Sequence, residues 1–480
     1  MKQSLFKSEA KTRREFLKTT ALAAGAITFG MPAVVRGQNL NSKVSIAGIG
    51  ITGKGRSDLD ACSGENIVAL CDVDRKRSQE LIAKYPNAKF YADFRKMFDA
   101  IGKSIDAVNI ATPDHTHALI ASHAIRLGKH VYCQKPLTQT IYEARLLRDL
   151  AREHKVVTQM GNQGSAADGL RRAVEVIQAG VIGHAREVHV WTNRPIWPQG
   201  CPRPAGSDPV PADFDWDLWL GPAPARPFKK DTYHPFVWRG WVDFGTGALG
   251  DMACHTVNMP FRALQLGYPG TIEAECSDMN GETYPLSSKI RFDFPMRFSA
   301  KNDVIPASSL WWYDGGKPKA DNPYRHDESC KPAKEITADV EAFRGEVPRS
   351  GCLIIGAKGQ IFSPDDYGTE FFIKLTGEDK FRFYKNHPAA EAVPQSIPRN
   401  PSKSGDGQHS EWITAIKDTK PETCYSRFEI AASLTEIMLL GCVALRAGKK
   451  IEWDGPNMRA TNAPEAKHFI KRHNRSGWSI

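Results

Sequence analysis

Asp251 and His255 are the two side chains of this sequence whose types and spacing fit acid–base chemistry best. They follow the glycine-rich segment 244–250 and lie four residues apart, so on a helix they share one face. A carboxylate beside an imidazole can fix the tautomer of the ring and raise its basicity. The structural alternative is an aspartate favoured by a helix amino terminus and a histidine bonded within the core.

A glycine turn at residues 48–53 has the pattern that binds a dinucleotide. It follows an apolar strand at 44–47, and a second strand at 67–71 ends in an acid. In such a turn the glycines allow a tight bend, a close approach of the pyrophosphate and close helix–strand packing, in that order. The helix amino terminus attracts phosphate, and the acid accepts from ribose hydroxyls. The residues predicted to bind the cofactor here are Gly48, Gly50, Ile51, Thr52, Gly53 and Asp72.

The acid also bears on which dinucleotide binds. A carboxylate at Asp72 repels a 2′-phosphate, which favours NAD over NADP. The cations of residues 75–77 follow closely and leave NADP open, although a solvated first helical turn explains them equally well.

Alternating strands and helices place these residues in a doubly wound parallel sheet. Ligands of such sheets bind beyond the carboxyl ends of the strands. The polar segments 112–117 and 134–136 fall at those ends. The strands are predicted at 44–47, 67–71, 106–111, 130–133 and 156–160, and helices at 118–127 and 141–154.

In combination, these motifs resemble the glucose-fructose oxidoreductase / inositol dehydrogenase (Gfo/Idh/MocA) family. They are the glycine turn, Thr112-Pro113-x-x-x-His117, Lys135-Pro136 and Asp251-x-x-x-His255. The resemblance implies that Lys135 lies beside the nicotinamide and the substrate hydroxyl, and that Asp251 and His255 lie in the substrate pocket, with His255 as general base. It extends the cofactor site to Thr112, Pro113, His117 and Lys135. The sequence departs from the family at Gln134, where a glutamate is usual.

The carboxyl-terminal half predicts an α+β domain with a mostly antiparallel, open sheet. Strands are expected at 185–191, 289–294, 352–356, 370–375 and 451–453, and helices at 409–417 and 427–445. The predicted organisation is a nucleotide-binding domain at 43–165, a substrate and oligomerisation domain at 166–455 and a tail at 456–480.

Six of the eleven tryptophans fall between residues 191 and 241. Such rings can stack on a sugar, or they can fasten an irregular segment to the sheet. Both roles stay open, and some rings can serve each. The predicted substrate contacts are Trp241 from this segment, Asn162 after a strand end and Asn258 one helical turn after His255.

Residues 1–37 have the pattern of a twin-arginine export signal. Paired arginines at 13–14 precede a small-residue, weakly apolar stretch at 19–35, which is a poor transmembrane helix. The sequence therefore predicts a periplasmic protein that uses the twin-arginine export machinery, with an uncleaved membrane anchor as the alternative. This segment carries half of the net charge of +10, and the mildly basic remainder gives no case for nucleic acid.

The cysteines and histidines give no metal-ligand spacing. The ten cysteines form no CxxC pair, and His115 and His117 lack further ligands, so no metal site is predicted. Cys71 and Cys133 are expected as buried thiols. Cys201, Cys276 and Cys330 are the better candidates if disulfides form.

The resulting hypothesis is an exported NAD(P)-dependent oxidoreductase that acts on a sugar or polyol hydroxyl. In it His255 removes the proton, Lys135 stabilises the oxyanion and Asp251 orients His255. One alternative is an NAD-dependent glycosidase that oxidises, eliminates and re-reduces without net redox. Another is a non-catalytic binding protein, which only Gln134 favours. Because a periplasmic enzyme has no free nicotinamide pool, the cofactor is expected to be exported bound and held tightly. A homo-oligomer is expected from the resemblance.

Overall fold

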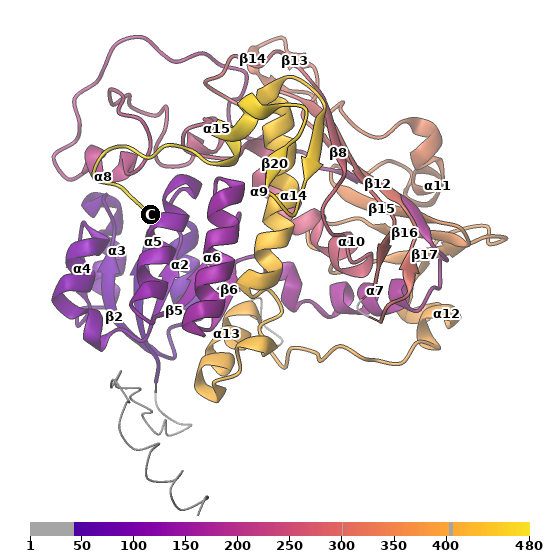
Figure 1. Cartoon of the computed structure of the whole chain (residues 1–480), viewed down its shortest axis with the longest axis horizontal. Coiled ribbons are helices and arrows are strands. Elements are labelled where there is room, and N and C mark those ends of the chain that lie inside the picture. Colours follow the sequence, from indigo (N-terminus) through magenta and orange to yellow (C-terminus); the bar gives the residue numbers. More distant parts are fainter. Residues whose placement is uncertain (1–42, 300, 403–406) are drawn as a thin grey trace, which may run out of the picture. The chain divides into compact units, whose positions relative to one another are not determined.

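A parallel sheet of order β3-β2-β1-β4-β5-β6 forms the amino-terminal half of the described chain (Figure 1). The structure is a computed structural model that describes residues 43–299, 301–402 and 407–480. The predicted twin-arginine signal lies outside these residues. The strands are β1 Ser45–Ile49, β2 Asn66–Cys71, β3 Lys89–Tyr91, β4 Ala107–Ile110, β5 His130–Cys133 and β6 Thr158–Met160.

Helices connect these strands and cover the sheet, so its central strands are buried. β4 is buried along its whole length, as expected for a parallel strand covered on both faces. The α6 helix begins with a capping box in which Thr140 and Glu143 exchange bonds, and it ends where predicted. The helices are α2 Lys54–Ala61, α3 Arg75–Lys84, α4 Phe94–Ile101, α5 Asp114–Arg126 and α6 Ile141–His154. The predicted doubly wound sheet is confirmed.

The second half contains a ten-stranded sheet of order β18-β17-β16-β15-β7-β12-β9-β8-β19-β20. Among the described residues, its pairings are antiparallel except that of β7 with β12, so the predicted mostly antiparallel sheet is confirmed. Its strands are β7 Ala185–Trp191, β8 Thr271–Cys276, β9 Ser288–Phe294, β12 Ser308–Asp314, β15 Gly351–Gly356, β16 Gly359–Ser363, β17 Phe372–Leu375, β18 Arg382–Phe383, β19 Ile451–Asp454 and β20 Arg459–Ala460. Two short pairs lie outside it, β10 Arg297–Phe298 with β11 Val304–Ile305 and β13 Pro318–Lys319 with β14 Asn322–His326.

One face of this sheet is covered by apolar helices. The side chains of β9 alternate between buried and half-buried, as expected for a sheet with one covered face. The remaining helices are α7 Asp168–Gln178, α8 Trp216–Leu220, α9 Gly247–Thr256, α10 Asn258–Ala263, α11 Lys334–Arg344, α12 Pro388–Glu391, α13 Gly407–Asp418, α14 Phe428–Ala447 and α15 Lys467–Ile470.

The α14 helix joins the two halves. Among the described residues, it alone is long and apolar enough to cross a membrane by length and composition, but 83% of that apolar window is buried inside the protein. It packs against α6 of the first half and against α9 and β8 of the second. Its composition is therefore that of a core helix between two sheets.

The ten cysteines all lie in the described chain, and none of them forms a disulfide. Cys71 and Cys133 are buried at the ends of β2 and β5, as expected, and burial raises the pKa of both thiols. Cys201, Cys276 and Cys330 form no disulfide.

Candidate active site

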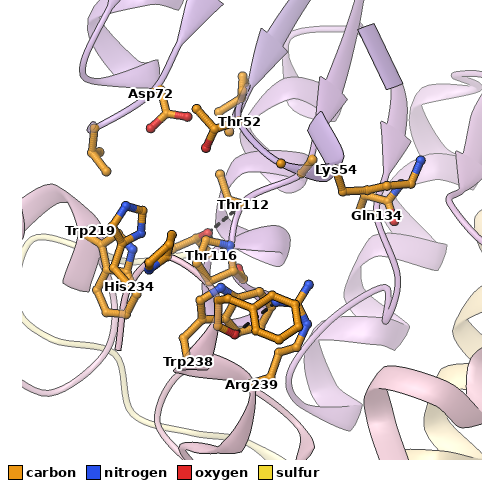
Figure 2. Close-up of a pocket in the computed structure, with 18 of the residues that line it drawn as sticks. Thr52, Lys54, Asp72, Thr112, Thr116, Gln134, Trp219, His234, Trp238 and Arg239 are labelled. Atoms are coloured by element: carbon orange, nitrogen blue, oxygen red, sulfur yellow. Dashed lines mark hydrogen bonds between the residues drawn. The ribbon is translucent and has the colours of Figure 1, made fainter. Parts of the chain in front are cut away.

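A cavity of about 580 Å³ opens where β1, β2, β4 and β5 end. One wall consists of the loops that follow these strands, with Asp72 and Lys135 among them. The other wall comes from the tryptophan-rich segment, from α9 and from Tyr367. Figure 2 shows Asp72 and Thr52 at the strand ends, with Trp238 and Arg239 facing them across the cavity. The position agrees with the rule that open α/β sheets bind ligands beyond the carboxyl ends of their strands.

The glycine turn leaves its backbone open to this cavity. Gly50 has φ +75°, and a Cβ there would stand 2.7 Å from the Thr112 nitrogen. Gly53 has φ +57°, and a Cβ there would meet nothing within 4 Å. Open space beside a turn that leads into α2 is what a pyrophosphate needs. Gly50, Thr52 and Gly53 all line the cavity.

Two glycine roles differ from those expected. Close helix–strand packing belongs to Gly48 and Gly55, because a Cβ would stand 2.6 Å from Leu59 at Gly48 and 1.8 Å from the Gly50 oxygen at Gly55. Neither Gly48 nor the buried Ile51 lines the cavity. These residues shape the turn, and the prediction that they contact the cofactor directly is not supported by their placement.

Asp72 closes β2 and faces the cavity with its carboxylate braced. Its oxygens accept from the backbone nitrogens of Ile51 and Asp74, each at 2.9 Å. Burial raises the pKa of Asp72, although these two bonds oppose the rise. A fixed carboxylate beside the glycine turn fits an adenosine ribose, so the residues present fit a dinucleotide.

His117 lies outside the cavity and contacts two of the loops that line it. Its ring nitrogens lie 2.8 Å from the Thr112 oxygen and 2.9 Å from the Pro136 oxygen. Burial lowers the pKa of His117 to about 4, so the ring is neutral near pH 7. His117 ties together the loops after β4 and β5 and does not line the cavity, which corrects its predicted role, whereas Thr112 and Pro113 do line it.

Lys135 and Asp251 form an ion pair at the inner end of the cavity. The Lys135 Nζ donates to the Asp251 Oδ1 and to its backbone oxygen, both at 2.8 Å, and the Arg239 Nε donates to the same Oδ1 at 3.2 Å. Burial alone would raise the pKa of Asp251, but Lys135 and Arg239 hold it far below its usual range. Asp251 therefore positions Lys135, whereas the sequence predicted that it orients His255.

His255 lines the same end of the cavity as a neutral imidazole. Burial, reinforced by the charge of Lys135, lowers the pKa of His255 well below its usual value. In the described chain its Nδ1 is buried without a hydrogen-bond partner, and its ring meets Tyr367 edge-on, with 5.0 Å between centroids. An uncharged imidazole beside a cavity can accept a proton.

Gln134 has a structural reason for replacing a glutamate. Its Nε2 donates to the Asp58 Oδ2 at 2.7 Å, and Asp58 is fully buried between Gln134, Lys54 and His409. A glutamate here would place a second carboxylate against that of Asp58. The glutamine amide therefore fixes the backbone before Lys135 without charge repulsion.

The three residues predicted to contact the substrate do not line the cavity. The side chain of Asn162 is used by Cys254, Ser165 and Ser426, and Asn258 bonds Ser165 and Arg262. Both asparagines are fully buried outside the cavity. Trp241 is buried in a cluster around Tyr233 and donates its indole N–H to the Thr232 oxygen at 3.0 Å. The structure places all three side chains in the core, where protein atoms satisfy their bonds, and their contact with a substrate stays a prediction.

The tryptophan-rich segment supplies cavity residues that the sequence did not single out. Trp197, Trp219 and Trp238 line the cavity, whereas Trp191, Trp216 and Trp241 do not. The high tryptophan content identifies the segment in the sequence, but only the folded structure shows which of its tryptophans line the cavity. Arg194, Arg239, His234, Tyr367 and Trp478 also line the cavity.

The segment and the chain end together cover the Asp72 end of the cavity. The segment joins the loop after β2, where the Arg75 nitrogen donates to the Asp213 oxygen and His234 lies 2.9 Å from the Asp74 carboxylate. The carboxyl-terminal tail returns to α8 (Figure 1). There Trp478 lines the cavity beneath the Arg95 guanidinium, 4.2 Å from the ring centroid.

Fold and cavity together define a Rossmann-type dinucleotide-binding protein with a second α/β sheet. Residues 42–162 match the oxidoreductase family model for an NAD-binding Rossmann fold, and residues 176–279 match the model for the family's carboxyl-terminal α/β domain. The chain belongs to this Gfo/Idh/MocA oxidoreductase family, and its amino-terminal domain is the family's NAD-binding domain.

Curated relatives match part of the chain. An inositol 2-dehydrogenase of Salmonella paratyphi B is 30% identical over 31% of this chain and 44% of its own length. A levoglucosan dehydrogenase of Pseudarthrobacter phenanthrenivorans is 26% identical over 46% of this chain and 50% of its own length. The chain thus spans half or less of the length of these relatives.

Solved structures share the fold across most of the chain. An inositol dehydrogenase homologue of Azotobacter vinelandii, complexed with NADH and myo-inositol, has a TM-score of 0.57 at 15% identity and covers 86% of this chain and 98% of its own. A levoglucosan dehydrogenase complexed with NADH and levoglucosan has a TM-score of 0.54 at 17% identity and covers 85% of this chain and 99% of its own.

Proposed function

We propose that this protein is an NAD-dependent oxidoreductase that oxidises a hydroxyl group of a sugar or polyol. The observation that carries the proposal is the meeting of Lys135 and His255, from opposite walls, in a cavity that begins at a dinucleotide-binding turn. Relatives that act on inositol and levoglucosan support a polyhydroxylated substrate.

In this proposal His255 takes the proton of the substrate hydroxyl on its neutral ring. The Lys135 ammonium, held by Asp251, stabilises the negative charge that develops on the same oxygen. A bound nicotinamide supplies the acceptor for the hydride that leaves the carbinol carbon. The alcohol thus loses a proton and a hydride and becomes a ketone.

We assign NAD as the cofactor on the basis of Asp72. Its carboxylate accepts from ribose hydroxyls and repels a 2′-phosphate. Arg77 also lines the cavity, but its neighbour Asp74 lies 4.0 Å from its guanidinium and offsets its charge. NADP is therefore the weaker ligand in this proposal.

We further infer that the cofactor is held through many turnovers and is exported with the protein. Two observations support this: the twin-arginine pattern of residues 1–37, and the covering of the Asp72 end of the cavity by Trp219 and Trp478. A cofactor that cannot exchange in the periplasm must be re-oxidised within the site. A periplasmic location and an oligomeric assembly are parts of this proposal.

The same covering favours a second candidate function, an NAD-dependent glycosidase. Oxidation at C3 would acidify the C2 proton, a base would remove it, and the anomeric substituent would leave C1. Water then adds at C1, a proton returns to C2, and the hydride returns to C3. The sum is glycoside hydrolysis without net redox, which suits a cofactor that stays in place.

The cofactor content of the purified protein tests the proposal. Protein purified without added nucleotide is denatured, and the supernatant is assayed for NAD(H) and NADP(H). We expect close to one NAD(H) per chain and none of the phosphorylated form. Protein that neither contains nor binds a dinucleotide would refute the proposal.

A second step separates binding from catalysis. Lys135→Met should keep the bound cofactor, because Asp72 and the glycine turn are untouched, but it should lose sugar-dependent reduction by about a hundredfold or more. Accumulation of NADH with a sugar identifies the dehydrogenase, and hydrolysis of a glycoside without NADH identifies the glycosidase. Full activity in the variant would refute the proposed role of Lys135 in stabilising the oxyanion.

A further inference from the structure

Arg194 lies at the inner end of the cavity with His255 and Tyr367, and its guanidinium forms no ion pair with an acid among the described residues. It follows β7, and its backbone oxygen is fixed by the Gly315 nitrogen at 2.8 Å. In the described chain, the one bond from its guanidinium goes to the amide oxygen of Asn193. No carboxylate of the described residues lies within 4 Å of it.

The other cations at this end have partners. Lys135 and Arg239 share the Asp251 carboxylate, and Lys54 is paired with the buried Asp58. Asp366 is close enough to interact electrostatically with Arg194. Its carboxyl group bonds Ser350, however, and forms no ion pair with Arg194 among the described residues. Lys135, Arg239 and Arg194 all line this end of the cavity, whereas Asp251 is the one described acid that lines it there.

We propose that the substrate carries a carboxylate, as in a uronic or aldonic acid, and that Arg194 binds it. This inference rests on the proposed function and names the substrate class of the same site. Guanidinium is always charged, and its planar N–H groups match a carboxylate with two parallel bonds. A half-buried guanidinium with unused donors is costly unless a ligand supplies an acceptor. Trp197 and Trp238 offer apolar faces for the sugar ring in the same cavity.

Matched pairs of acid and neutral substrates test this inference. Protein with its bound cofactor is given D-glucuronate or D-glucose, D-galacturonate or D-galactose, and D-gluconate or D-glucitol. The second-order rate constant for reduction of the bound NAD is measured in a single turnover. We expect the acid to be preferred in at least one pair by about tenfold or more. A preference for the neutral member in every pair would overturn the inference and leave the proposed function standing.

Variants assign the preference to Arg194. Arg194→Gln should bring the acid-to-neutral ratio of this rate constant close to one, and Arg194→Lys should keep part of the preference. Arg186→Gln is the matched control, because Arg186 is an exposed arginine on β7 of the same segment. An unchanged ratio in Arg194→Gln would overturn the assignment.

Calorimetric binding of the same pairs separates failure of this inference from failure of the proposed function. Tighter binding of an acid that is lost in Arg194→Gln, without NADH formation from any sugar, would refute the oxidoreductase activity and support the anionic site. Equal binding of the acid and neutral members in all pairs would overturn the inference whether or not NADH forms.

Discussion

Gln134 places a neutral amide, and not a second carboxylate, beside the buried Asp58. Its amide nitrogen donates to Asp58, and its amide oxygen accepts from the Lys135 backbone nitrogen at 3.3 Å. The departure from the usual glutamate therefore does not mark a protein without activity. The buried carboxylate beside this peptide is that of Asp58 on α2, and the side chain of Gln134 donates a hydrogen bond to it.

A glutamate at position 134 should be destabilising. In Gln134→Glu a carboxylate replaces the amide that lies 2.7 Å from Asp58, so two like charges meet in a buried place. We expect the free energy of unfolding to fall by about 1–3 kcal/mol near pH 7.5. Chemical denaturation of wild type and variant measures the difference.

The pH dependence identifies the cause. The pKa of the introduced glutamate is raised in the folded protein, so the penalty grows as pH rises from its unfolded value towards the folded one. The loss of stability should be smaller near pH 4.5 than near pH 7.5. A loss that is equal at both values would indicate a packing defect, and Gln134→Met controls for removal of the hydrogen bond alone.

At the scale of elements, the cavity depends on a segment and a tail that come from distant parts of the sequence. The tryptophan-rich segment joins the loop after β2, and the tail joins α8, where Arg475 donates to the Gly221 oxygen at 3.1 Å. Together they cover the end of the cavity that holds Asp72. Cofactor retention is therefore a property of these two elements and not of the parallel sheet alone.

Removal of the tail's tryptophan should accelerate cofactor release. Trp478 is 7% exposed and lines the cavity, so Trp478→Ala opens the Asp72 end to solvent. We expect the dissociation rate of NAD(H) to rise about tenfold, which corresponds to a loss of about 1.4 kcal/mol. Stopped-flow displacement with a fluorescent dinucleotide analogue measures the rate.

Phe469→Ala is the control for this experiment. Phe469 lies on α15 of the same tail and packs against Arg446, away from the cavity. Equal release rates for Trp478→Ala and wild type, or the same increase in Phe469→Ala, would contradict a specific role of Trp478 as a cover.

At the scale of the whole molecule, buried acids make stability depend on pH. Asp314 at the end of β12 is buried and accepts from the Trp312 indole at 2.6 Å and from the Ser288 hydroxyl at 2.9 Å. Burial raises the pKa of Asp314 to about 7, and burial raises that of Asp114 to about 7 as well. Burial of these two carboxyl groups therefore makes the folded protein more stable when they are protonated than when they are charged.

Asp314→Asn should flatten the pH dependence of stability. Because the folded pKa exceeds the unfolded one, wild-type stability from this group is present below about pH 4 and is lost as pH rises to about 7. Over these three pH units the loss is on the order of 4 kcal/mol. The asparagine oxygen keeps both accepted bonds without the titration. Calorimetric melting between about pH 5 and pH 8 checks this.

Asp321→Asn, at an exposed position, provides the comparison. It should show the same pH slope as wild type, because its side chain is exposed in the folded protein. The prediction fails if Asp314→Asn retains the wild-type slope. Part of the slope is expected to remain in Asp314→Asn in any case, since Asp114 still titrates.

The sequence by itself determined the local elements and the residues that recur at strand ends. The strands at 130–133 and 185–191 and the helix at 141–154 agree with the structure to the residue, because apolar runs, caps and glycines act over short distances. Asp72 and Lys135 could be placed at the cavity because the ends of parallel strands meet at one edge.

Only the tertiary structure decided which partner each polar side chain takes. Asp251 shares a helix face with His255 but pairs with Lys135, which stands 116 residues away in sequence. Asn162, Asn258 and Trp241 have suitable chemistry, yet core atoms satisfy their bonds. Arg194 instead reaches the cavity without an ion-pair partner in the part of the chain that the structure describes. Hydrogen bonds and ion pairs depend on distances of a few ångströms, and those distances are set when segments far apart in sequence pack together.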